Sequence, residues 1–115
     1  MTRPDKRRTP RIDVRQRLNG YLVSIDRPAV VLDISLGGFS VETEDEVPDG
    51  VHIIRLREGD RWSVTVTAAS RHGRTKGGDG GKRHITGFEY ADQNPDTQQT
   101  IRVLFERLAA EETVE

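Results

Sequence analysis

Two clusters of residues in this chain have side-chain types and a spacing that suit the binding of a charged ligand. The first is Arg7-Arg8-Thr9-Pro10-Arg11, in which Arg7 and Arg11 are four positions apart. The second is Asp33-Ile34-Ser35-Leu36-Gly37-Gly38, an Asp-x-Ser-x-x-Gly pattern at the end of a β-branched run. Arginine donates hydrogen bonds through a planar fork, and Asp and Ser beside glycines commonly bond backbone amides in a turn. Each cluster alone is weak evidence, since basic tails and such turns are common.

The charge distribution draws attention to the first cluster. The chain has 115 residues and a net charge of −1, but the segment from Arg3 to Arg17 holds seven basic and two acidic residues. That segment therefore carries +5 and the remainder −6. A basic arm on an acidic body suggests an anionic partner, and the alternative is a solvated tail that only aids solubility.

Composition limits the classes of protein to which the chain can belong. Its length fits one compact domain, and 33% hydrophobic residues imply a modest core. The absence of cysteine excludes disulfides and thiolate zinc sites. No apolar stretch is long enough to cross a bilayer, and the N-terminus lacks a signal-peptide core, so we expect a cytoplasmic protein without membrane insertion.

Alternating apolar residues predict six short strands, which the clusters above would need as a scaffold. They cover residues 21–25, 29–34, 39–43, 51–57, 61–71 and 84–90. Turns are expected at Asp26-Arg27-Pro28 and at Glu58-Gly59-Asp60, and residues 71–83, with five glycines, are expected to form a flexible loop. Gly87, inside the last strand, is expected to mark a bulge or a close backbone approach.

One helix is expected at the C-terminus. Asn94 or Asp96 can cap it and Pro95 suits its first turn. An apolar stripe at helical spacing would cover an open side of the sheet, and it consists of Ile101, Leu104, Phe105 and Leu108. Together, the expected strands and helix predict a mainly β fold, a six-stranded antiparallel barrel with a C-terminal α-helix. Residues 1–15 would form a basic, flexible arm, residues 16–110 the barrel and helix, and residues 111–115 a disordered tail.

Taken together and in this order, the two clusters resemble the signature of the PilZ family. That signature is Arg-x-x-x-Arg followed, about twenty to thirty residues later, by Asp or Asn-x-Ser-x-x-Gly; here 21 residues separate Arg11 from Asp33. The basic arm, the strand order, the Gly87-Phe88 element and the terminal helix extend the resemblance to nearly the whole chain. It implies a six-stranded barrel with a C-terminal helix and cyclic di-GMP (c-di-GMP) as ligand, with no cofactor.

The chemistry of that ligand suits the residues. Guanine offers the O6 and N7 acceptors to an arginine fork, and its N1–H and N2–H₂ donors to a carboxylate. By the family motif, Arg7 and Arg11 would contact guanine edges and phosphates, with Arg8 as a further phosphate contact, and Asp33 would accept from a guanine. The arm would wrap the ligand only when it is present.

The remaining expected ligand contacts come from the turn and from one strand. Ser35 would bond the ligand or hold the turn, and Gly38 would permit a positive φ or a close approach, with Gly37 beside it. Arg71 is an additional candidate, through stacking on a base; the alternative for it is an ordinary exposed arginine.

No pattern in the sequence indicates an enzyme or a metal site. The three histidines are scattered, the acidic loop with Asp45, Glu46 and Asp49 is expected to be exposed and unpaired, and no nucleophile elbow or phosphate-cradling loop is present. We therefore expect a c-di-GMP receptor that acts in trans on a protein effector. Two alternatives stay open: a PilZ-like protein-interaction module that does not bind nucleotide, and a small barrel that binds single-stranded nucleic acid, although 5% aromatic residues make nucleic acid an unlikely partner. The pathway, the ligand stoichiometry and the oligomeric state are left undetermined.

Overall fold

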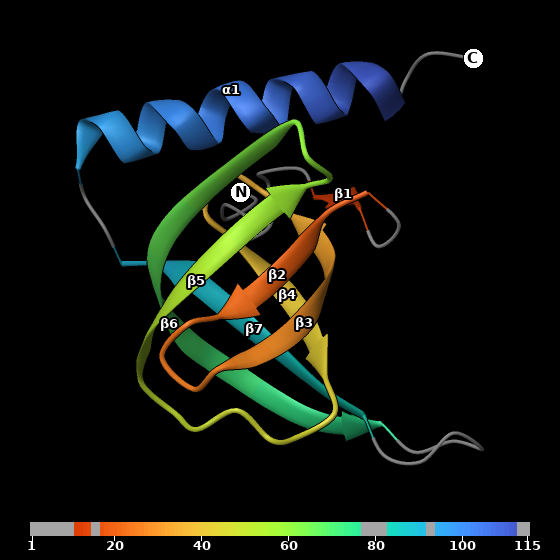
Figure 1. Cartoon of the computed structure of the whole chain (residues 1–115), viewed down its shortest axis with the longest axis vertical. Helices are drawn as coiled ribbons and strands as arrows, with labels where there is room; N and C mark the ends of the chain where they lie inside the picture. Colours follow the sequence, from red (N-terminus) through yellow and green to blue (C-terminus); the bar gives the residue numbers. More distant parts are fainter. Residues whose placement is uncertain (1–10, 15–16, 77–82, 92–93, 113–115) are drawn as a thin grey trace, which may run out of the picture.

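The computed structural model describes residues 11–14, 17–76, 83–91 and 94–112. Seven strands precede one helix: β1 (Ile12–Asp13), β2 (Asn19–Leu22), β3 (Arg27–Ile34), β4 (Gly38–Thr43), β5 (Val51–Glu58), β6 (Trp62–Lys76), β7 (Arg83–Tyr90) and α1 (Pro95–Glu112). All pairings are antiparallel, in the order β1-β3-β2-β5-β6-β7-β4, and β3 also pairs with β4. That last pairing closes six strands into a barrel (Figure 1), which confirms the predicted fold class; β1 is an extra strand on β3.

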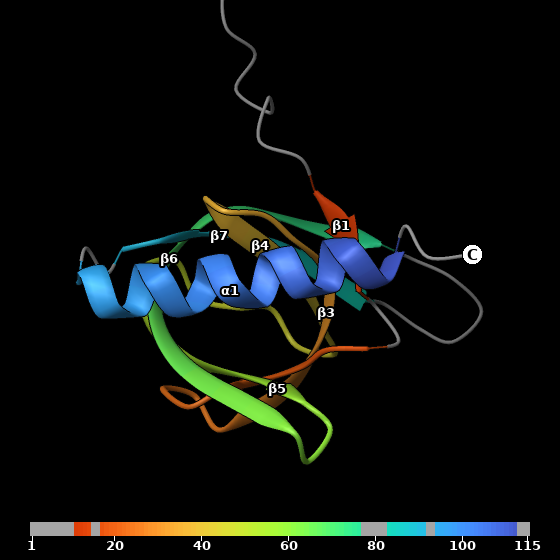
Figure 2. The same cartoon turned by 90° about the horizontal axis from the view of Figure 1, so that it is seen from above.

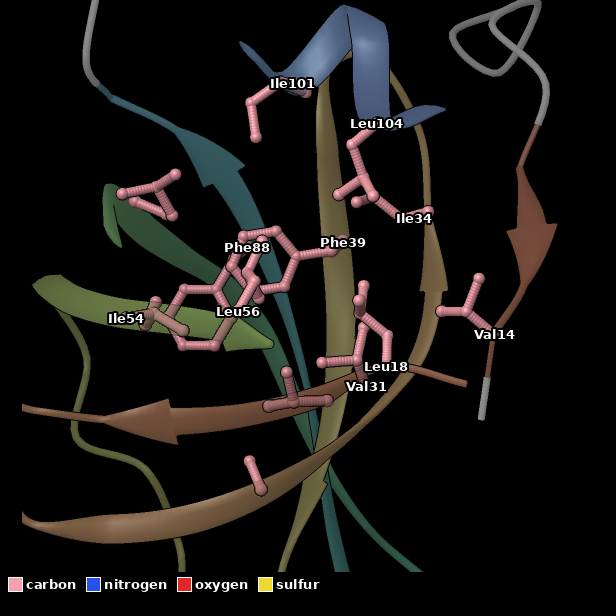
Figure 3. Close-up of a cluster of buried hydrophobic side chains, with 14 of the residues drawn as sticks. Val14, Leu18, Val31, Ile34, Phe39, Ile54, Leu56, Phe88, Ile101 and Leu104 are labelled. Atoms are coloured by element: carbon pink, nitrogen blue, oxygen red, sulfur yellow. The ribbon is translucent and has the colours of Figure 1, made fainter. Parts of the chain in front are cut away.

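Alternate residues of the strands fill the barrel interior, except where β-bulges interrupt β3 and β6. The buried and exposed residues of β5 alternate strictly over its eight positions, as expected for a strand with one face on a core. Phe39 and Phe88 stack at 5.3 Å between ring centroids near the centre of this core (Figure 3). Each such fully buried apolar side chain contributes about 1.5–3 kcal/mol relative to an exposed one.

The helix α1 lies across one end of the barrel (Figures 1 and 2). Its expected stripe is buried, with Leu104 and Leu108 fully inaccessible. Asn94, and not Asp96, caps the helix, because its Oδ1 accepts from the Asp96 amide at 2.8 Å and Pro95 is the first helical residue. The helix runs to Glu112, two residues into the segment expected to be a tail. No helix among the described residues combines the length and apolar character needed to cross a membrane.

Several expected element boundaries differ in the structure. The first turn precedes Arg27, which already belongs to β3 together with Pro28; Asp26 supplies the turn with a φ of +56°. Strand β6 continues to Lys76 and β7 begins at Arg83, so both ends of the segment expected to be a loop are paired strand. Long antiparallel pairing overrides the weak strand propensity of a glycine-rich sequence there.

The arm expected over residues 1–15 lies only partly within the described residues. Residues 11–14 pack against the barrel, where Ile12 and Val14 are 3% and 1% exposed. Ile12 pairs with Ile34, and the amide of Val14 donates to the carbonyl of Leu32 at 3.0 Å. The C-terminal end of the arm is therefore part of the barrel's core packing.

Candidate ligand-binding face

An ion pair joins the two sequence clusters. Arg11 Nη1 lies 2.7 Å from Asp33 Oδ1, with side-chain exposures of 45% and 31%. The pairing of β1 with β3 produces this contact, because Asp13 lies opposite Asp33 and brings the residues before it alongside. The other predicted arginines of the arm, Arg7 and Arg8, lie outside the described residues. The fold thus brings together one arginine and the carboxylate of the expected site.

A β-bulge turns Asp33 out of the barrel. Val31 pairs with Val41 and Asp33 with Ser40, so Leu32 is an extra residue in β3. Val31 and Ile34 are consequently both fully buried although they are three positions apart. Without the extra residue, Asp33 would share the inward face of Val31. The bulge therefore makes this carboxylate accessible to a ligand.

Asp33 begins a row of residues that crosses the outside of the barrel. The hydroxyl of Ser40 donates to Asp33 Oδ2 at 2.9 Å, Ser40 pairs with Gly87, and Gly87 lies opposite a register shift in β6 between Ser70 and His72. Because neighbouring strands are about 4.8 Å apart, the row from β3 to β6 is about 14 Å wide. We call it the Asp33 row: Asp33, Ser40, Gly87 and Arg71.

Arg71 is the bulged residue of β6 at the far end of the Asp33 row. It lies in the interior of a strand that runs to Lys76, not at the strand end expected from sequence. Its Nε donates to Glu89 Oε1 at 2.6 Å, and its side chain is 59% exposed. The guanidinium is thus held on the same outer surface as Asp33 and stays accessible.

The turn between β3 and β4 is organised by Ser35. Its hydroxyl accepts from the amides of Gly37 and Gly38, both at 3.2 Å, and its own amide donates to the Gly38 carbonyl at 2.8 Å. Ser35 is only 5% exposed. Of the two roles expected for this residue, the structure shows the one of holding the turn; its contact with a ligand stays a prediction.

The two glycines of this turn have different environments. A Cβ on Gly38 would lie 2.0 Å from the carbonyl oxygen of Phe88, so the expected close approach is real, whereas positive φ among the described glycines occurs at Gly50 and Gly59. A Cβ on Gly37 would meet nothing within 4 Å. Of these two positions, only position 38 must be a glycine, because packing leaves no room there for a Cβ.

Tyr90 ties the turn to the end of β7. Its amide donates to the Gly37 carbonyl at 3.2 Å and its hydroxyl to the Ser35 carbonyl at 3.4 Å. Burial raises the pKa of the Tyr90 hydroxyl well above its usual value. The residue therefore stays neutral and links the Asp-x-Ser-x-x-Gly turn to the strand that leads to α1.

Groups suited to a metal ion do not gather in the described part of the chain. His52, the buried histidine, is occupied on both ring nitrogens: Nδ1 lies 2.8 Å from Ser24 Oγ and Nε2 lies 2.7 Å from the Pro48 carbonyl. It serves as a core hydrogen-bonding group between two loops.

No family model matches the sequence, and no curated protein matches it significantly. Solved structures do match the fold. The PilZ domain of YcgR from Escherichia coli, solved with c-di-GMP, aligns with a TM-score of 0.73 and 16% identity over 94% of this chain and 95% of that one. The chain has a PilZ-like fold.

Two further solved structures share this PilZ-like fold, a complex with c-di-GMP and an inhibitor of motility. The K. pneumonia MrkH–c-di-GMP complex aligns with a TM-score of 0.78 at 17% identity, over 95% of this chain and 55% of that one. MotI/DgrA, the Bacillus subtilis inhibitor of motility, aligns with a TM-score of 0.67 and 17% identity, over 95% of this chain and 54% of that one. The chain thus spans about half the length of these two proteins.

Sequence reasoning missed two members of the Asp33 row in this PilZ-like barrel. Ser40 alternates with the inward Phe39 and Val41, which indicates its outward face, but its pairing with Asp33 depends on the bulge. Gly87 was expected to mark a bulge or a close approach; the bulge lies opposite it in β6, and a Cβ on Gly87 would meet nothing within 4 Å. Gly87 therefore leaves a bare stretch of backbone between two polar side chains.

Proposed function

We propose that the chain is a non-enzymatic receptor for c-di-GMP that binds the nucleotide over the Asp33 row and acts in trans on a protein effector. The observation that supports this most is the Arg11–Asp33 ion pair, which joins both sequence clusters on one exposed surface. Since c-di-GMP is an intracellular messenger, the proposed receptor works in the cytoplasm.

The chemistry of the row matches the two parts of the ligand. Arg11, with Arg7 and Arg8 from the arm, supplies guanidinium groups for phosphates and for the O6/N7 edge of guanine. Asp33 accepts from the opposite guanine edge. The bare backbone at Gly87 leaves room for a base to lie flat, and Arg71, on the neighbouring strand, would stack on that base.

The fold neighbours support the assignment to signalling. The YcgR domain and MrkH were both solved with c-di-GMP. MrkH is described as a c-di-GMP-dependent transcription regulatory factor and MotI/DgrA as an inhibitor of motility. We propose the same kind of role here, in which the ligated arm changes the surface shown to the effector.

Isothermal titration of the full chain with c-di-GMP tests the proposal. Arg11→Ala and Asp33→Asn should each weaken binding by about 10–150-fold, the equivalent of one charged hydrogen bond of about 1.5–3 kcal/mol. The matched control is Arg27→Ala, which removes the same charge from an Arg–Asp pair with Asp45 at 3.2 Å. Arg27 lies six residues from Asp33 along β3, about 20 Å away, so its loss should change the affinity less than twofold.

Parallel titrations with GTP and with a single-stranded oligonucleotide separate the alternatives. Absence of heat with c-di-GMP for the folded wild type would exclude the receptor function. Oligonucleotide binding with a steep salt dependence, and none of c-di-GMP, would indicate the nucleic-acid alternative instead.

A further inference from the structure

Ser40, in the middle of the Asp33 row, fixes one of the two carboxylate oxygens of Asp33. Its hydroxyl donates to Asp33 Oδ2 at 2.9 Å, while Arg11 Nη1 lies 2.7 Å from Oδ1. The terminal torsion of an aspartate side chain is broad and roughly two-fold, so the plane of a free carboxylate is poorly defined. Two donors on different oxygens remove that freedom here.

The pairing of the strands directs the Ser40 hydroxyl to this carboxylate. Ser40 lies between two buried residues of β4 and therefore faces outward. Its partner on β3 is Asp33, and its partner on β7 is Gly87, which has no side chain. The register of β3 and β4 is thus sufficient to place the donor beside its acceptor.

The two donors to Asp33 are held by the fold to different degrees. Arg11 lies next to the two-residue strand β1 and is 45% exposed, and the proposed ligand would draw its guanidinium away from Asp33. Ser40 belongs to a strand that is paired on both sides. Its hydroxyl therefore still fixes the plane of the carboxylate after Arg11 has moved to the ligand.

The plane of the carboxylate affects which purine it can accept. Guanine presents two adjacent donors, N1–H and N2–H₂, one for each carboxylate oxygen. Adenine presents the N6–H₂ donor beside the lone pair of its N1, so a carboxylate held in the same plane turns its second oxygen against that lone pair. A carboxylate that is free to rotate can turn this oxygen away and keep the contact with N6. A fixed plane therefore favours guanine over adenine.

We propose that Ser40 is a positioning residue that sets the base selectivity of the site: it holds Asp33 so that c-di-GMP is bound and its adenine counterpart, cyclic di-AMP (c-di-AMP), is rejected. This inference rests on the proposed receptor function. Ser40 acts through Asp33 and not on the base. Because a carboxylate oxygen can accept two hydrogen bonds, Oδ2 keeps its bond from Ser40 while it accepts from guanine.

Competition titrations of the full chain with c-di-GMP and c-di-AMP test this role. Ser40→Ala should weaken c-di-GMP binding about 3–10-fold, the equivalent of one lost hydrogen bond. It should change the affinity for c-di-AMP less than about twofold, so that the preference for guanine falls by the same factor of about 3–10. Ser40→Thr, which keeps the hydroxyl, should stay within about twofold of wild type for both nucleotides.

The matched control is Ser63→Ala, at an exposed position of β6 eight residues before Arg71, which should leave both affinities unchanged. A second measurement places Ser40→Ala in an Asp33→Ala background. There it should alter c-di-GMP affinity less than about twofold, because no carboxylate is left to hold. Equal losses in the two backgrounds would overturn the role of Ser40. An equal loss of both nucleotides, or a threonine that fails to restore binding, would do so too.

The role of Ser40 and the receptor function can fail separately. If the wild type binds c-di-GMP and Asp33→Asn weakens binding, but Ser40→Ala does not, the role of Ser40 is refuted and the receptor function stands. A folded wild type that does not bind c-di-GMP refutes both.

Discussion

Replacing Gly38 by alanine should destabilise the fold far more than the same change one residue earlier. A Cβ on Gly38 would lie 2.0 Å from the Phe88 carbonyl oxygen, where contacts under 3.0 Å are essentially never seen. The obstacle is backbone at the first pair of the β4–β7 ladder, where Gly38 lies opposite Glu89, and not a side chain that can rotate away. The strands must therefore separate by at least about 1 Å at this position.

The cost can be estimated from the bonds that such a shift would strain. The Gly38 carbonyl accepts from the Ser35 amide at 2.8 Å, and its amide donates to Ser35 Oγ at 3.2 Å. Two or three hydrogen bonds of about 0.5–1.5 kcal/mol each are at risk, and overpacking typically costs about 1–3 kcal/mol. We expect Gly38→Ala to lower the free energy of unfolding by about 2–4 kcal/mol.

Gly37→Ala is the matched control, since an added Cβ there meets nothing within 4 Å. It should be neutral or stabilising by up to about 1 kcal/mol, through the lower entropy of the unfolded chain. Urea unfolding followed by fluorescence of Trp62, the single tryptophan and one packed against the core, measures both variants. If the two midpoints gave unfolding free energies within about 1 kcal/mol of each other, the close approach would not constrain this turn.

Two further predictions concern Tyr90 and the start of α1. Because the raised pKa of Tyr90 favours its neutral form in the fold, its stabilising effect should be complete below about pH 10 and lost as the pH rises further. Between pH 10 and 12 the wild type should then lose up to about 1.4 kcal/mol per pH unit more than Tyr90→Phe; parallel stability–pH curves would contradict this. Asn94→Ala should cost about 1 kcal/mol in urea unfolding, whereas Gln99→Ala, at an exposed helical position, should change stability by less than about 0.5 kcal/mol.

Local patterns in the sequence were sufficient to predict six of the seven strands and the helix. The alternation of Trp62, Val64 and Val66 reflects direct contact with a core, and the stripe that includes Leu104 and Leu108 does the same at helical spacing. Each of these signals lies within a few neighbouring residues. The barrel class follows from them, because six short strands need closure to avoid exposed edges.

What the sequence did not reveal depends on contacts between distant segments. The bulge at Leu32 leaves no signature of its own in a β-branched run, yet it decides whether Asp33 faces solvent. Strand β1 is two residues long and forms only because β3 offers it an edge. The Asp33 row likewise depends on the register of four strands, which no local pattern specifies.

The Arg11–Asp33 ion pair does not prevent a ligand from reaching the proposed site. Arg11 and Asp33 are 45% and 31% exposed, and such solvent-accessible pairs contribute about 0–1 kcal/mol. A single hydrogen bond from a ligand to either charged group is worth about 1.5–3 kcal/mol. A nucleotide that engages both groups therefore gains more than it loses by separating them. In the free protein the pair keeps the end of the arm beside Asp33, so the proposed ligand would redirect an arginine that is already in place.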